Sequence, residues 1–265
     1  MAPVELGPLR AQINYLFQHF SDAEFFTESL LLFLERYKQK KGITNSWLGS
    51  STSLPVFNSP QILITEILTT LEGHVQSNPD SALLISELLW KQKEYEPKML
   101  AYQIIYLMPE KHTFQVLSHL EKWIEENPDD YLVTQMVAAC FNRETLILSD
   151  RFLISTQKWL LSRDIKHRKI GIKALETLAK SRSFTNLPYL FQLTEYQIAS
   201  PIIEIRKDLL ALIWAFIERS EAETAAFLIS ISQIHQEKNL LAFVRKCYPL
   251  FSDFYREEIQ AALPI

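Results

Sequence analysis

Apolar residues recur along this chain at spacings of three and four positions, and polar residues fill most positions between them. Such a period places the apolar side chains on one face of a helix, and the alternation of period two that marks β-strands is nearly absent. Pro, Asn, Asp and Ser stand between the periodic segments, where these residues cap or interrupt helices. The pattern therefore predicts an all-α protein.

The interruptions divide the chain into a series of helical segments. Three helices are expected before residue 79, with a Ser- and Thr-rich loop over residues 42–60 among them. From there on the segments follow one another closely and form pairs. The expected helices start near residues 79, 95, 111, 127, 149, 165, 184, 200, 220, 240 and 252.

The helix pairs repeat at a regular distance. When the second helix of each pair is aligned on one inward-facing position, the aligned residues are Lys98, Val133, Arg168, Arg206 and Arg245, with steps of 35, 35, 38 and 39 residues. Two-helix units of this length are typical of α-solenoids of the HEAT class, in which each unit buries one face against its neighbours. We therefore expect an α-α superhelix, a HEAT-like solenoid of antiparallel helix pairs with a concave face.

This architecture predicts a single domain over residues 1–265. Its first part, residues 1–78, contains the N-terminal helices and the loop, and residues 79–265 contain the helix-pair repeats. Trp90, Trp123 and Trp159 each stand near the end of a first helix, where we expect them to pack in the core or between repeats.

Composition limits the classes of function. A formal net charge of −4 and a pI of 5.9 argue against a protein that coats nucleic acid through bulk charge, although they allow a local basic face. Cys140 and Cys247 lie far apart in apolar segments, so neither a disulfide framework nor a cysteine metal site is expected. The N-terminus has no apolar signal core, and the longest apolar run, residues 209–217, is too short to cross a bilayer. We expect a cytoplasmic protein that does not bind membranes.

A basic dipeptide recurs at the aligned position of the last three pairs. The residues are Arg168-Lys169, Arg206-Lys207 and Arg245-Lys246. At roughly 100° per residue, Arg168 and Arg206 stand in line with the apolar faces of their helices, in the first turn, and each following lysine points about a quarter-turn away. An arginine at such a position requires a partner or access to water.

Two interpretations of these arginines stay open. Cations spaced by one repeat along the concave surface could follow a phosphate backbone, which arginine binds in a bidentate manner. Alternatively, each arginine could link adjacent repeats by pairing with an aspartate or glutamate. The chain contains no metal-binding histidine motif, no phosphate-binding glycine loop and no nucleophile elbow, so we expect no cofactor and no metal.

Four phrases, read in order, resemble the AlkD-type DNA alkylation repair proteins, which are HEAT-like solenoids. They are "WLGSSTSLPVF" (47–57), "ELLWKQKEYEPKMLAYQII" (87–105), "QKWLLSRDIKHRKIGI" (157–172) and "IIEIRKDLLALIWAF" (202–216). The resemblance implies that duplex DNA binds in a concave basic cleft. It also implies a glycosylase that releases alkylated purines by means of an aspartate, flanking aromatic residues and an arginine.

The family's functional positions are not all kept in this chain. Its Trp-x-x-x-Asp pattern falls on Asp130 and Thr134, and its second cleft tryptophan falls on Ala211. Its arginine falls on Lys169, or on Arg168 if the register shifts by one. Glycosidic cleavage develops positive charge on the sugar, which a carboxylate stabilises and a threonine cannot. Asp130 and Tyr131 are the alternative catalytic residues.

Three hypotheses follow. The first is a divergent AlkD-like protein that lacks standard alkylpurine DNA glycosylase activity and binds double-stranded DNA through its concave face. The DNA-binding candidates are Arg168, Lys169, Arg206, Lys207, Arg245 and Lys246. The second is a scaffold that binds a protein partner on the same face. The third is an active glycosylase with a displaced catalytic carboxylate.

Overall fold

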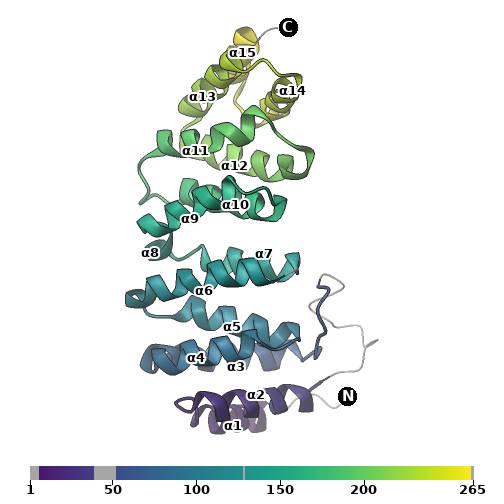
Figure 1. Ribbon diagram of the computed structural model, residues 1–265, viewed down its shortest axis with the longest axis vertical. Coiled ribbons are helices and arrows are strands. Elements are labelled where there is room, and N and C mark those ends of the chain that lie inside the picture. The colour runs from purple at the N-terminus through teal and green to yellow at the C-terminus, as the bar shows by residue number, and fades with distance from the viewer. Residues whose placement is uncertain (1–5, 39–51, 128, 264–265) are drawn as a thin grey trace. The chain divides into compact units, whose positions relative to one another are not determined.

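The computed structural model describes residues 6–38, 52–127 and 129–263, and within these ranges it contains helices, turns and loops but no strand (Figure 1). The predicted all-α fold is therefore confirmed. The chain divides into two compact units, Met1–Cys140 and Phe141–Ile265, which are described one at a time. Within the described ranges, no helix is long and apolar enough to cross a membrane.

The first unit is built from two rows of helices. Its helices are α1 (Leu6–Phe17), α2 (Ala23–Arg36), α3 (Gln61–Ser77), α4 (Pro79–Trp90), α5 (Tyr95–Leu107), α6 (Thr113–Glu126) and α7 (Asp130–Cys140). Helices α1, α3, α5 and α7 pack on one another in that order, and α2 packs on α4. Each of these helices thus contacts the helix two positions along the chain, which is the stacking of an α-solenoid.

The second unit repeats this arrangement. Its helices are α8 (Glu144–Ile147), α9 (Asp150–Leu160), α10 (Ile165–Lys180), α11 (Leu187–Ala199), α12 (Arg206–Arg219), α13 (Glu221–Ile234), α14 (Lys238–Cys247) and α15 (Asp253–Ala262). Helices α10, α12 and α14 form one row, and α9, α11, α13 and α15 form the other. The pattern did not predict α8, because its four residues are too few to show a helical period.

The residues that interrupt the apolar pattern start the helices. The side chains of Asp22, Ser149, Asp164, Asn186 and Ser220 each accept a hydrogen bond from a backbone N–H in the first turn of the helix that follows. These N–H groups have no carbonyl partner inside the helix, so a polar side chain at this position fixes the start of the helix. This explains why the expected starts lie close to the observed ones.

The predicted burial of three tryptophans is confirmed. Trp90, Trp123 and Trp159 are buried, and the rings of Trp90 and Trp123 stack with their centroids 4.3 Å apart. Trp214 on α12 keeps 44% of its surface exposed. Trp47 and most of the loop over residues 42–60 lie outside the described residues. Both cysteines are buried and form no disulfide, as expected.

Gly171 lies where α10 packs tightly against the end of α9. A Cβ atom at this position would lie 2.8 Å from Leu160 Cγ and 2.9 Å from the backbone nitrogen of Leu160. Both distances are shorter than a carbon atom tolerates, so the backbones of the two helices can lie this close only because residue 171 has no side chain.

Two buried carboxylates hold the segment that precedes α3 against the first turns of α5 and α7. Asp129, which is 3% exposed, accepts hydrogen bonds from Thr52 Oγ1, from Ser53 N and Oγ, and from Leu132 N, at 2.7–2.9 Å. Glu96 accepts from the backbone N–H groups of residues 57 and 59 at 3.0 and 3.3 Å. These hydrogen bonds therefore hold the segment from residue 52 to α3 against the helices of the first unit.

Candidate nucleic-acid interface

The arginines of the basic dipeptides on α10 and α12 bind the backbone of their own helix pair. Arg168 Nε donates to the carbonyl oxygen of Ser162 at 2.8 Å, and Arg206 Nε donates to that of Pro201 at 3.2 Å. Each carbonyl lies in the turn before the helix, where it has no partner within a helix. Neither arginine forms an ion pair with a carboxylate within the described ranges, so the repeat-linking ion pair is not observed there. Phosphate binding by these arginines stays a prediction.

The same contact occurs in two further pairs. Lys98 Nζ donates to the carbonyl oxygen of Trp90 and lies 4.7 Å from the centre of that indole ring. Arg256 donates to the carbonyl oxygens of Tyr248 and Phe251 at 3.2 and 3.0 Å. We call Lys98, Arg168, Arg206 and Arg256 the capping cations. Each is the fourth residue of its helix when the 3-10 turn Ile203–Ile205 is counted as the start of α12.

Arg245 does not continue the register of Arg168 and Arg206. Helix α14 begins at Lys238, so Arg245 lies in its last turn, and the matching contact is made by Arg256 in α15. Arg245 lies beside Tyr248. Burial raises the pKa of the Tyr248 hydroxyl, and the guanidinium of Arg245 lowers it by a smaller amount. Spacing alone could not show this, because the last helices are shorter than those of the preceding pairs.

The lysines of the three dipeptides are exposed. Lys169 is in the first turns of α10 and Lys207 is at the start of α12, whereas Lys246 is at the end of α14. Two other lysines of α10 are partly neutralised, because Lys173 and Lys180 contact the buried carboxylate of Glu176 at 2.9 and 2.6 Å. Three of the predicted DNA-binding residues therefore present an ammonium group to solvent. They are Lys169, Lys207 and Lys246, all in the second unit.

Asp208, which the sequence analysis did not single out, faces α10 from the first turn of α12. Burial raises the pKa of this carboxyl group, and the nearby Glu176 raises it further, whereas Lys169 and Lys173 lower it. The raising effects outweigh the others, so the pKa of Asp208 lies above the ordinary aspartate value. The carboxylate therefore lies in the field of Lys169 and offsets part of its charge. Only the packing of α10 against α12 brings residues 169 and 208 together.

Trp214 adds an exposed aromatic ring to the same helix. It follows Lys207 by seven residues and Ala211 by three, so all three lie on one face of α12. Ala211 is the position where the resemblance expects a tryptophan. An indole is therefore present on this face, one helical turn further along.

Thr134, at the family's aspartate position, lies on the first unit. It is exposed, and its hydroxyl donates to the carbonyl oxygen of Asp130 at 2.7 Å. Asp130 is the exposed first residue of α7, and Tyr131 is half-buried, with its ring centroid 5.9 Å from that of Tyr95. Of the three catalytic candidates, only Asp130 carries a carboxylate.

Comparison with known proteins agrees with the resemblance. A model of the family described as DNA alkylation repair enzyme matches residues 64–246, which is more than half of the chain. The matched region runs from α3 into α14 and includes Thr134, Lys169, Asp208 and Trp214. No curated protein matches the chain.

Proposed function

Because the chain belongs to the DNA alkylation repair enzyme family, we propose that it binds double-stranded DNA through exposed lysines of its second unit, without the excision of alkylated purines. The observation that carries the proposal is the family match over residues 64–246. The exposed Lys169 and Lys207 at the starts of two stacked helices support it. An ammonium group binds phosphate as a point charge and needs no fixed geometry.

In this proposal the capping cations have a supporting role. Arg168 and Arg206 hold the turns before α10 and α12, and Lys169 and Lys207 follow them directly. The fixed turns orient the first residues of each helix. The two ammonium groups therefore lie on neighbouring helices, α10 and α12. Trp214 on the α12 face supplies an aromatic surface on which a base or sugar can stack.

The proposed absence of excision rests on residue 134. The Thr134 hydroxyl donates a hydrogen bond to a backbone carbonyl of its own helix and carries no negative charge. It therefore cannot stabilise a developing oxocarbenium ion. Asp130, one turn earlier, is exposed to water, which weakens its effect on any nearby positive charge.

A titration of a fluorescent duplex by anisotropy tests the DNA-binding surface. We expect the double variant Lys169→Ala/Lys207→Ala to bind about tenfold more weakly and to reduce the slope of log affinity against log salt by about two, one for each phosphate contact. Trp214→Ala should weaken binding by a similar factor, since one stacking contact is worth about 1–3 kcal/mol. Lys122→Ala, which removes an exposed lysine from α6 of the first unit, is the matched control.

The same preparation, incubated with alkylated DNA, should release purines no faster than buffer. An absence of DNA binding at low salt would contradict the proposal and favour the scaffold hypothesis. Purine release that Asp130→Asn abolishes would instead support the displaced carboxylate.

Asp208→Asn is expected to raise DNA affinity severalfold at neutral pH, because it removes a negative charge beside Lys169. The net pKa of Asp208 is above the ordinary range, so the carboxyl group takes up its proton at a higher pH than a free aspartate does. The DNA affinity of the wild type should therefore rise as the pH falls towards that pKa, because protonation removes the negative charge of Asp208. Asp208→Asn has no such charge to lose, so its affinity should rise less over the same pH range. Titrations at several pH values measure it, with Glu223→Gln on α13 as the control. Equal affinities of wild type and Asp208→Asn would contradict this prediction.

A further inference from the structure

We infer that the outer surface of α1 and α2 is a docking site for a second copy of this chain, with the two α2 helices packed antiparallel about a twofold axis near Leu32. This surface belongs to the first unit, and its argument does not depend on the proposed DNA-binding surface of the second.

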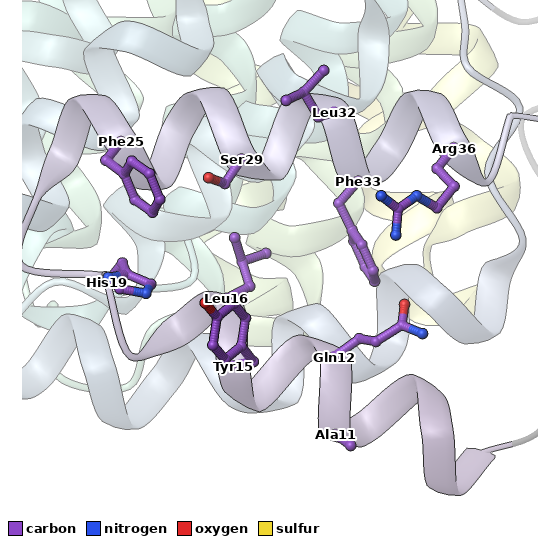
Figure 2. A pocket seen from close by; sticks show the side chains of 10 residues that line it. All are labelled: Ala11, Gln12, Tyr15, Leu16, His19, Phe25, Ser29, Leu32, Phe33 and Arg36. Atoms are coloured by element: carbon purple, nitrogen blue, oxygen red, sulfur yellow. The ribbon is translucent and has the colours of Figure 1, made fainter.

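The docking site is a groove between two helices. It has a volume of about 470 Å³, and its lining comes from α1 and α2 (Figure 2). Phe25 and Phe33 point from α2 towards α1, with Tyr15 and Leu16 of α1 opposite them, whereas Leu32 projects away from α1. The lining residues of each helix recur at spacings of three and four, so the groove follows the helices along their length.

Three apolar side chains at this surface are largely exposed. Tyr15, Phe25 and Leu32 keep 67%, 49% and 71% of their surfaces accessible. The opposite face of α2 is also apolar and is fully buried, with α4 packed against the helix. A helix with apolar residues on both faces is typical of a position inside a stack. Within the described ranges α2 ends its row, so one of its two apolar faces has no helix packed on it.

Charge complementarity indicates that the occupant is a second copy. Glu28 and Arg36 are exposed on α2, four residues before and four residues after Leu32. Neither forms an ion pair within the described part of the chain, whereas Glu35 pairs with Lys38 at 3.2 Å. When two α2 helices pack antiparallel with Leu32 at the axis, Arg36 of each copy faces Glu28 of the other. An isologous interface has this self-complementary pattern.

The area of the surface indicates how tightly the two copies associate. The 14 residues of α2 span about 21 Å at a rise of 1.5 Å per residue. An interface built on one such helix from each copy lies at or below the lower end of the range for stable complexes, about 1,200–2,000 Å². We therefore expect a reversible dimer whose population rises with protein concentration.

Sedimentation velocity of the full chain, from about 10 µM to several hundred µM, tests this inference. The expected result is a species of 30.9 kDa at low concentration and a dimer of twice that mass at high concentration. Leu32→Glu should abolish the dimer, and Arg36→Glu should weaken it about tenfold. The charge-swapped double variant Glu28→Arg/Arg36→Glu should restore it.

Ile154→Glu provides the matched control, because it places the same charge at an exposed aliphatic position of α9 in the second unit. Circular dichroism verifies that each variant keeps its helices. A wild-type chain that stays monomeric at the highest concentration overturns the inference. Failure of the charge swap to restore the Leu32-centred dimer overturns the antiparallel geometry.

Discussion

Gly171→Ala is expected to lower the free energy of unfolding of the second unit by about 2–3 kcal/mol. The added methyl group would lie 2.8 Å from Leu160 Cγ and 2.9 Å from Leu160 N. A side chain can rotate away, but a backbone nitrogen moves only if α9 shifts against α10. That shift disturbs the packing of α9 on α10, and the loss exceeds the gain in helix propensity that alanine provides, about 1 kcal/mol.

Denaturant unfolding followed by circular dichroism measures this effect, and Gly73→Ala is the matched control. Gly73 lies inside α3, and a Cβ atom there meets nothing within 4 Å. This control should stabilise the first unit by about 0.5–1 kcal/mol. The double variant Gly171→Ala/Leu160→Ala should show non-additive losses, because removal of the leucine side chain relieves one of the two clashes. A Gly171→Ala variant as stable as the wild type would show that the helices separate at little cost.

Asp129→Ala should destabilise the first unit by about 3 kcal/mol, because it removes the acceptor of hydrogen bonds from residues 52 and 53 and from the buried N–H of Leu132. Asp129→Asn should cost less, since the amide oxygen can still accept one or two of these bonds. Asp130→Asn is the control, as it changes an exposed neighbour on the same turn. Thermal unfolding gives the order of stabilities, and proteolysis near residue 53 reports whether the segment before α3 detaches first.

The same carboxylate predicts a pH dependence. Burial raises the pKa of Asp129, but the hydrogen bonds from Leu132, Ser53 and Thr52 outweigh burial, and its net pKa is below the ordinary value. A lowered pKa stabilises the folded state fully above the unfolded-state pKa of about 3.9, and this stabilisation is lost as the pH falls through the folded-state pKa. The difference in stability between wild type and Asp129→Asn should therefore be constant at neutral pH and shrink below about pH 4. A difference that is independent of pH would contradict the assigned role.

The helices could be predicted from the sequence because both their period and their caps are local. Asp164 and Ser149 cap helices through backbone groups two or three residues away, and such signals need no knowledge of the fold. Asp129 contacts Ser53 across 76 residues, and no local pattern indicates that pairing.

The candidate site also combines features that local sequence determines with features that depend on tertiary packing. The exposure of Lys169 and Lys207 follows from their place on the helix, which the apolar stripe defines. The partial neutralisation of Lys169 by Asp208 depends on how α10 packs on α12, and the contacts of Arg168 and Arg206 depend on the path of the preceding turn. A helical wheel shows that an arginine at such a position needs a partner, but it cannot show which one.

The capping cations also bear on the order in which the chain folds. Their contacts join residues only five to eight positions apart, all within one helix pair. Closing so short a loop has a small entropic cost, so the bend of each pair can form before any other pair is in place. We therefore expect folding to begin at one of these four bends and to spread from there to the neighbouring pairs.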